Sequence, residues 1–175
     1  MLIEKDKSSL VVIDVQDKLL SVMPKPHSFV ANIIKLQKAA DILNIPSTIS
    51  EQYPKGLGST IEKIKKNKHK SVIEKTNFSI VSEGYFFEAS QIIMCGIEAH
   101  VCVLQTAIEL ADNKEKRIFI VQDAISSRYE KDYLTALSRL SKYPNIEIVS
   151  CEMVLFEWLK KSGTEEFKTI SQLLK

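Results

Sequence analysis

Short apolar runs alternate with amphipathic segments along the whole chain, and this alternation limits the possible folds more than any other feature. The run Ser9–Val15 is almost entirely apolar and rich in Val and Ile, which is typical of a strand buried on both faces of a parallel sheet. Apolar residues then recur at helical spacing from Phe29 to Leu43. Asn44 can close that helix, and Pro46 prevents its continuation.

The same alternation continues to the carboxyl end. Further strands are predicted at Pro46–Ser50, Ser71–Ile73, Gln91–Cys95, Arg117–Gln122 and Asn145–Val149. Helices are predicted after the capping boxes Ser59–Glu62, Ser127–Glu130 and Ser162–Glu165, and over Cys102–Asn113 and Met153–Lys160. Strand–helix–strand units imply right-handed crossovers. We therefore expect one domain, residues 1–175, with a three-layer α/β/α fold and a doubly wound, six-stranded parallel sheet.

Composition and charge exclude several classes of protein. Lys and Arg total 24 against 22 Asp and Glu, a net charge of +2, which argues against a nucleic-acid partner. No apolar run approaches the ~20 residues of a membrane span, and the first residues lack the apolar core of a signal peptide. The five glycines form no dinucleotide or phosphate-binding motif, so no cofactor is expected. Three cysteines without an export signal indicate reduced thiols and a cytoplasmic location.

Functional groups in parallel sheets gather beyond the carboxyl ends of the strands. This rule selects Asp14, Glu51, Glu74, Lys75, the segment Gly96–Cys102 and Asp123. Cys102 stands where a helix is predicted to begin, so unpaired N–H groups and the helix dipole should make its thiol more acidic. Asp14 could accept the thiol proton, and Lys75 could lower the thiol pKa or hold a substrate carbonyl. Together these three side chains form a plausible acyl-transfer site.

Each of these residues also has a purely structural interpretation. Cys102 could be a small buried residue, Asp14 could cap a turn, and Lys75 could be a surface charge. His100 could pair with Cys102, but we favour pocket lining for it. The basic run Lys63–Lys70 has no interleaved aromatic residues and is interpreted as a solvated face.

The combination of segments is more specific than any single residue, and it resembles the isochorismatase-like cysteine hydrolases. The matching segments are VVIDVQ (Val11–Gln16), EKTNFS (Glu74–Ser79), CGIEAHVCVLQTA (Cys95–Ala107), VQDAISSR (Val121–Arg128) and SCEMVLFEWL (Ser150–Leu159). The resemblance implies a catalytic triad of Asp14, Lys75 and Cys102. It also implies a cis peptide bond at Ile97–Glu98, which turns the Glu98 N–H toward the pocket. With the Cys102 N–H, that group would form an oxyanion hole.

Two departures from the family pattern narrow the expected chemistry. Nicotinamide-hydrolysing members carry an Asp-x-His metal motif after the second strand, whereas this chain has Glu51–Gln52–Tyr53–Pro54, so no metal is expected. Isochorismatases that cleave a vinyl ether lack the nucleophilic cysteine. The loop Glu51–Gly58 is most similar to that of the isochorismatase domain-containing subgroup.

The leading hypothesis is a cysteine hydrolase of a small amide or related carbonyl compound, acting through a thioester. Metal-free vinyl-ether hydrolysis, with Asp14 as general acid, and a non-catalytic scaffold are the alternatives. The candidate pocket-lining residues are Gln16, Glu51, Tyr53, Phe78 and His100.

Two apolar segments predict self-association, because one core of this size could not cover both. They are the helix with Val103, Leu104, Ala107, Ile108 and Ala111, and the segment with Met153, Leu155, Phe156 and Trp158. The family resemblance also implies oligomers. We therefore expect a homodimer or larger assembly with a contact near the active-site mouth.

Overall fold

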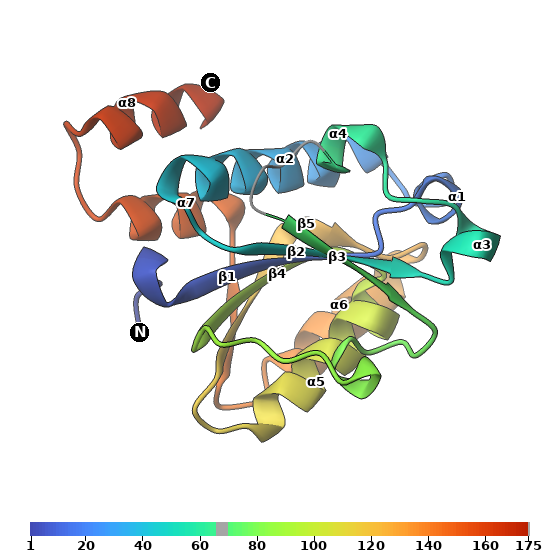
Figure 1. Ribbon diagram of the computed structural model, residues 1–175. Coiled ribbons are helices and arrows are strands. Elements are labelled where there is room, and N and C mark those ends of the chain that lie inside the picture. The colour runs from blue at the N-terminus through green and yellow to red at the C-terminus, as the bar shows by residue number, and fades with distance from the viewer. Residues whose placement is uncertain (66–69, 175) are drawn as a thin grey trace.

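The computed structural model describes residues 1–65 and 70–174, and within them six parallel strands form one sheet (Figure 1). The strands are β1 (Ser8–Ile13), β2 (Ser47–Gln52), β3 (Lys70–Lys75), β4 (Gln91–Ile97), β5 (Arg117–Ser126) and β6 (Ile146–Val149). Their order is β3-β2-β1-β4-β5-β6, and every neighbouring pair is parallel. This arrangement confirms the predicted doubly wound sheet.

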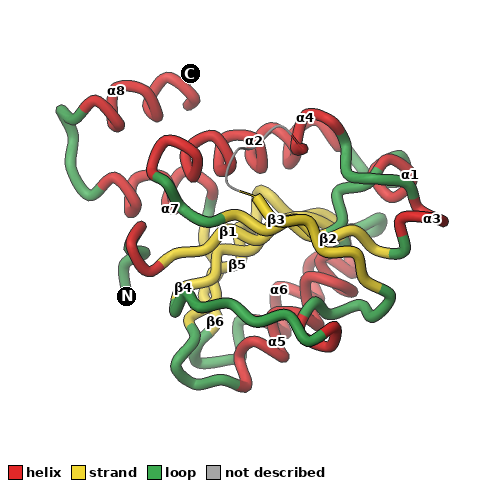
Figure 2. The backbone as a smooth tube through the Cα atoms, in the orientation of Figure 1, coloured by secondary structure: helices red, strands yellow, loops and turns green. Residues whose placement is uncertain are grey.

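Helices cover both faces of the sheet, as Figure 2 shows in red around the yellow strands. The helices are α1 (Asp17–Leu20), α2 (Pro26–Leu43), α3 (Pro54–Leu57), α4 (Glu62–Lys65), α5 (Leu104–Asp112), α6 (Glu130–Leu140), α7 (Cys151–Leu159) and α8 (Glu165–Ser171). Short turns of 3₁₀ helix lie at Lys5–Lys7, Val81–Glu83 and Gln172–Leu174, and a π-helical turn lies at Ala99–Val103. Across the described residues, no helix has the length and apolarity needed to cross a membrane.

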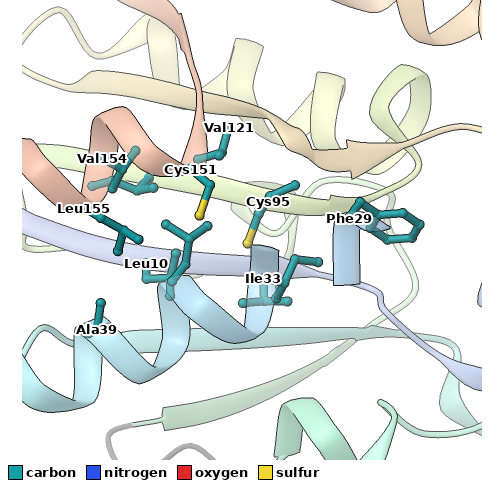
Figure 3. Close-up of a cluster of buried hydrophobic side chains, with 14 of the residues drawn as sticks. Leu10, Phe29, Ile33, Ala39, Cys95, Val121, Cys151, Val154 and Leu155 are labelled. Atoms are coloured by element: carbon teal, nitrogen blue, oxygen red, sulfur yellow. The ribbon is translucent and has the colours of Figure 1, made fainter. Parts of the chain in front are cut away.

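Two apolar clusters fill the layers between sheet and helices. One cluster joins the sheet to α2 and α7 and includes Cys95 and Cys151, whose sulfur atoms lie in the core (Figure 3). The other joins the opposite face to α5 and α6. All six residues of β1 are buried, because this strand lies in the middle of the sheet and is covered on both faces. That burial explains why Leu10–Ile13 of this strand are continuously apolar rather than alternating.

The helix boundaries follow local chemistry only in part. Asn44 closes α2 in the left-handed region with φ 55°, as its position before Pro46 predicts. The helices predicted after the three capping boxes form, but the predicted serine caps neither α6 nor α8. Helix α6 starts at Glu130 without a side-chain cap, and the Ser127 hydroxyl bonds to His100 instead of to a helical N–H. Helix α4 starts at Glu62, and the Thr164 hydroxyl, not that of Ser162, caps α8 by accepting the N–H of Phe167.

The predicted helix over Cys102–Asn113 is also corrected. It is preceded by a π-helical turn, in which the carbonyl oxygen of Glu98 accepts N–H bonds from Val101 at 3.0 Å and Val103 at 3.3 Å. Cys102 lies inside this turn, one residue before its end, and the regular helix α5 begins only at Leu104. The predicted placement of Cys102 at a regular helix start is therefore wrong.

Candidate active site

The candidate site lies where the strand order reverses, between the carboxyl ends of β1 and β4. Ligand sites of open parallel sheets are found at this point. Asp14 directly follows β1, and the Ala99–Val103 turn with Cys102 follows β4. In Figure 1 this edge of the sheet faces α1 and α3.

The close approach of β1 and β4 at this point depends on a glycine. Gly96 has φ 114°, and a Cβ atom there would lie 2.6 Å from the backbone nitrogen of Ile13. No side chain fits at that distance. Asp14, the residue that follows β1, adopts φ 50°, which is uncommon for a residue with a side chain and is found at functional sites.

Asp14 and Lys75 form a fully buried ion pair. The Lys75 Nζ lies 2.8 Å from Asp14 Oδ2, and neither side chain has any exposed surface. Ser50 Oγ donates to the other carboxylate oxygen, Asp14 Oδ1, at 2.6 Å. Both carboxylate oxygens are thus hydrogen-bonded, as a buried charge requires.

The Lys75 ammonium has more acceptors than it has protons. Besides Asp14, it faces Gln52 Oε1 at 2.5 Å and the carbonyl oxygens of Phe78 at 3.0 Å and Asn77 at 3.3 Å. An ammonium group has three N–H donors, so all of them are used within the protein. We expected that Lys75 could hold a substrate carbonyl, but a donor would first have to leave one of these partners.

Cys102 completes the cluster, and its thiol is less acidic than we expected. It is 6% exposed, and its sulfur lies 3.9 Å from Gln52 Oε1. Burial, followed by the charge of Asp14, raises the pKa of Cys102 to about 12, although the charge of Lys75 acts in the opposite direction. Burial likewise raises the pKa of Cys151 to about 12. The predicted acidification is therefore wrong, because burial and a neighbouring carboxylate outweigh the lysine.

Two residues that sequence reasoning missed contact the triad. Ser50 and Gln52 lie two positions apart in β2, and side chains at that spacing share a face of the sheet. Gln52 also donates from Nε2 to the carbonyl of Thr76 at 2.7 Å, which fixes its oxygen toward Lys75. The signal in the sequence is the spacing of two residues between Ser50 and Gln52. It was missed because the predicted strand ended at Ser50.

The expected pocket-lining residues have different surroundings. Gln16 is buried and bonds to the Gln52 backbone through Oε1 at 2.7 Å and Nε2 at 3.0 Å, so it supports the end of β2. Glu51 points to the other face of β2, where it accepts the N–H of Thr60 at 2.7 Å and pairs with Lys65 at 3.4 Å. His100 is half-buried, with Nδ1 3.0 Å from Ser127 Oγ.

Tyr53 and Phe78 lie at the outer rim, with relative exposures of 55% and 51%. Tyr53 lines a cavity of about 310 Å³ beside Lys75. The other lining residues are Pro54, Lys55, Glu74, Thr76 and Glu83. A larger cavity, of about 950 Å³, is lined instead by the amino-terminal residues and α7.

The peptide bond between Ile97 and Glu98, just before the turn that contains Cys102, is cis. Glu98 is 8% exposed, and its carboxylate contacts Arg128.

Among the described residues, no group of three or more His, Cys, Asp or Glu side chains could hold a metal ion. The basic run Lys63–Lys70 lies partly outside the described residues.

Comparison with known proteins gives consistent matches over almost the whole chain. A family model described as the isochorismatase domain matches residues 8–151. Isochorismatase domain-containing protein 2 from Danio rerio is 36% identical over 173 residues, covering 95% of this chain and 86% of the relative. The secreted isochorismatase effector Isc1 from Phytophthora sojae is 33% identical over 179 residues, covering 96% and 84% respectively.

Among solved structures, the MAR1 ribonuclease from Caenorhabditis elegans has a TM-score of 0.92 and 31% identity, covering 99% of this chain and 92% of the neighbour. The fold is therefore shared with this neighbour along almost the full length of both chains.

Proposed function

This chain belongs to the isochorismatase family, and on that premise we propose that it is a cysteine-dependent hydrolase of a small amide or related carbonyl compound. The observation that carries the proposal is the buried cluster at the sheet edge, in which Asp14, Lys75 and Cys102 meet around Gln52. A nucleophile, a base and a fixed positive charge are the groups that acyl transfer requires.

The raised pKa of Cys102 favours proton transfer during attack over a thiolate formed in advance. Asp14 accepts the thiol proton as the sulfur–carbon bond forms, and the carbonyl electron pair moves to oxygen. The N–H groups of Glu98 and Cys102 hold that oxyanion. Asp14 then protonates the leaving amine as the carbon–nitrogen bond breaks, which leaves a thioester on Cys102.

Water completes the cycle. Asp14 accepts a proton from the attacking water, hydroxide adds to the thioester carbonyl, and the sulfur–carbon bond breaks. The departing sulfur takes the proton back from Asp14, which restores the resting thiol. Lys75 balances the negative charge of Asp14 whenever that carboxylate is ionised, and the backbone donors supply the hydrogen bonds to the substrate.

Limited access to the nucleophile supports a small substrate. Cys102 is only 6% exposed, which leaves little room for a large substrate to reach its sulfur. Nucleic acid is a poor fit, because net charge is +2 and the nucleophile is nearly covered. The C. elegans neighbour is nevertheless named a ribonuclease, so RNA belongs among the compounds tested.

Self-association and a cytoplasmic location are part of the same proposal. Leu2, Met153 and Phe156 leave 66%, 48% and 43% of their surface exposed, which supports a contact between subunits. The P. sojae relative is named a secreted effector, so location within the family varies.

A screen of amides, esters, vinyl ethers and a short RNA, with wild-type protein and the Cys102→Ala and Asp14→Asn variants, tests the function. We expect hydrolysis of an amide or ester that both substitutions abolish, with a Cys102 adduct detected by peptide mass mapping. Vinyl-ether cleavage that survives Cys102→Ala would support the general-acid alternative. No turnover of any compound and no adduct would leave the scaffold alternative.

A further inference from the structure

The loop that carries Cys102 is linked to the segment after β5 by a carboxylate and an arginine. Glu98 Oε2 accepts the backbone N–H of Arg128 at 3.0 Å and the Nε–H of its guanidinium at 3.2 Å. The Glu98 side chain is 10% exposed, whereas that of Arg128 is 51% exposed. A nearly buried carboxylate is thus held by a group that reaches in from the surface.

A second link joins His100, two residues after Glu98, to Ser127, the residue before Arg128. His100 Nδ1 lies 3.0 Å from Ser127 Oγ, and Ser127 is buried. Both links directly follow the last ladder pair of β4 and β5, which joins Ile97 to Ser126. The strand pairing is therefore continued by side-chain bonds up to the turn that contains Cys102.

The contact with Arg128 contributes more to geometry than to stability. An ion pair with one half-exposed partner is worth ~0–1 kcal/mol, because water screens it and the long side chain loses freedom. An oxyanion donor, by contrast, must be held within about 0.5 Å of its productive position. Glu98 is both the residue whose carboxylate Arg128 holds and the residue whose N–H faces the oxyanion in the proposed mechanism.

We propose that Arg128 is a positioning residue, which holds the Glu98 carboxylate and thereby fixes the Glu98 N–H as an oxyanion donor. This inference rests on the proposed function. It predicts that losing the guanidinium impairs attack on a carbonyl but leaves the reactivity of the Cys102 sulfur itself unchanged.

Two probes separate these properties. With p-nitrophenyl acetate, the sulfur adds to a carbonyl, an oxyanion forms, and p-nitrophenolate leaves. With iodoacetamide, the sulfur displaces iodide at a saturated carbon, and no oxyanion forms. The ratio of the two rates at Cys102, corrected with Cys102→Ala for Cys95 and Cys151, therefore reports the oxyanion donors alone.

We expect Arg128→Ala to lower this ratio about tenfold, less than the 10²–10³-fold loss of a complete oxyanion donor, because the Arg128 N–H still contacts Glu98. Added guanidinium should restore part of the loss, since the position that the Arg128 side chain leaves is half-exposed to solvent. Arg117→Ala is the matched control: it removes an arginine at the other end of β5, whose Nη1 contacts only the carbonyl of Pro144 among the bonds described, and the ratio should not change.

An unchanged ratio in folded Arg128→Ala, or a loss that guanidinium leaves in place, would overturn the inference. If circular dichroism shows that Arg128→Ala does not fold, Glu98→Ala and Arg128→Met, which remove the acceptor and the donor of the same contact, carry the same test, and an unchanged ratio in both folded variants is equally decisive. If Cys102→Ala does not reduce acylation of the otherwise intact protein, the proposed nucleophile itself is wrong. This outcome distinguishes failure of the proposed function from failure of the inference about Arg128.

Discussion

Lys75 and Asp14 form an ion pair of 2.8 Å in which neither side chain has exposed surface, although they lie 61 positions apart in the sequence. The pair connects β3 to the end of β1 across β2, and Ser50 and Gln52 of β2 contribute hydrogen bonds to its two members. Moving two charges out of water is costly, and such a pair is weak evidence for stability. Its place beside Cys102 instead supports a chemical role.

Removing one member of this pair should destabilise the protein strongly. Lys75→Met leaves the Asp14 carboxylate buried without its counter-charge, and we expect the free energy of unfolding to fall by about 3–5 kcal/mol. Chemical denaturation measures this change. Lys168→Met, at an exposed pair on α8, is the control and should have little effect. The double variant Asp14→Asn, Lys75→Met should be more stable than Lys75→Met alone, and the opposite order would contradict this reading.

The pH dependence of Cys102 alkylation should reflect its raised pKa of about 12. At neutral pH the thiol is protonated, so alkylation by iodoacetamide should be slow and should still increase with pH beyond the ordinary cysteine value of 9.0. Because the charge of Asp14 raises this pKa, Asp14→Asn should lower it and speed alkylation at a given pH. The same variant should lose ester hydrolysis, since its base is gone. Stopped-flow alkylation with mass mapping checks both, and a plateau near neutral pH would refute the assignment.

The stability of the protein in acid should depend on Glu51. Burial opposes ionisation of this carboxyl, but the Thr60 N–H and the Lys65 ammonium outweigh it and hold the pKa of Glu51 below its ordinary 4.5. A lowered folded-state pKa stabilises the protein above the unfolded value, and that contribution is lost as pH falls through the folded value. Melting temperatures of Glu51→Gln should therefore converge with wild type below about pH 4.5. The difference between the two melting temperatures, followed as a function of pH, measures this change, and a difference that stays constant would contradict the expectation.

The sequence was sufficient for the sheet and for the family, which the isochorismatase domain match confirms. Buried parallel strands need apolar residues on both faces, so the middle of each strand can be recognised in the sequence. The carboxyl ends are harder to recognise, because β2 continues through the polar residues Glu51 and Gln52, whose backbone still pairs with β3. That is why Gln52 was missed.

The acidity of Cys102 could not be predicted for a different reason. A helix start predicts a lower thiol pKa from the local backbone dipoles alone. The pKa of Cys102 is instead set by burial and by Asp14, which lies 88 positions earlier in the sequence. The Ser127 hydroxyl likewise bonds to His100, from another loop, and not to its own helix. In both cases a contact between distant segments outweighs a local preference.

Hydrolysis should not require a metal ion. The loop after β2 presents Gln52, whose oxygen faces Lys75 instead of a cation, and Glu51, which is bound to Thr60 and Lys65. We expect activity to be unchanged after dialysis against a chelator, measured with metal content determined by mass spectrometry on the same sample. Stoichiometric zinc that is lost together with turnover, and that restores it when added back, would overturn this expectation.

The protein should form a homodimer or larger assembly, and the structure changes where its contact is expected. Most of the apolar side chains that suggested a contact are buried within the chain, including Val103, Ala107, Leu155 and Trp158. Met153 and Phe156 of α7 stay exposed and line the cavity of about 950 Å³ together with Met1 and Leu2. This surface lies where the chain approaches β1 and not at the carboxyl ends of the strands, so a contact at the active-site mouth is no longer the favoured one.

Light scattering should give a mass above 19.8 kDa for the wild-type protein. Phe156→Asp should lower that mass, because a charge in an apolar contact disfavours association. Leu134→Asp, at a 55% exposed position on α6, should leave it unchanged. Phe156 also lies 6.4 Å from the Phe167 ring, so melting curves must show that the variant is folded. A 19.8 kDa wild-type species that persists at high concentration would exclude the assembly altogether.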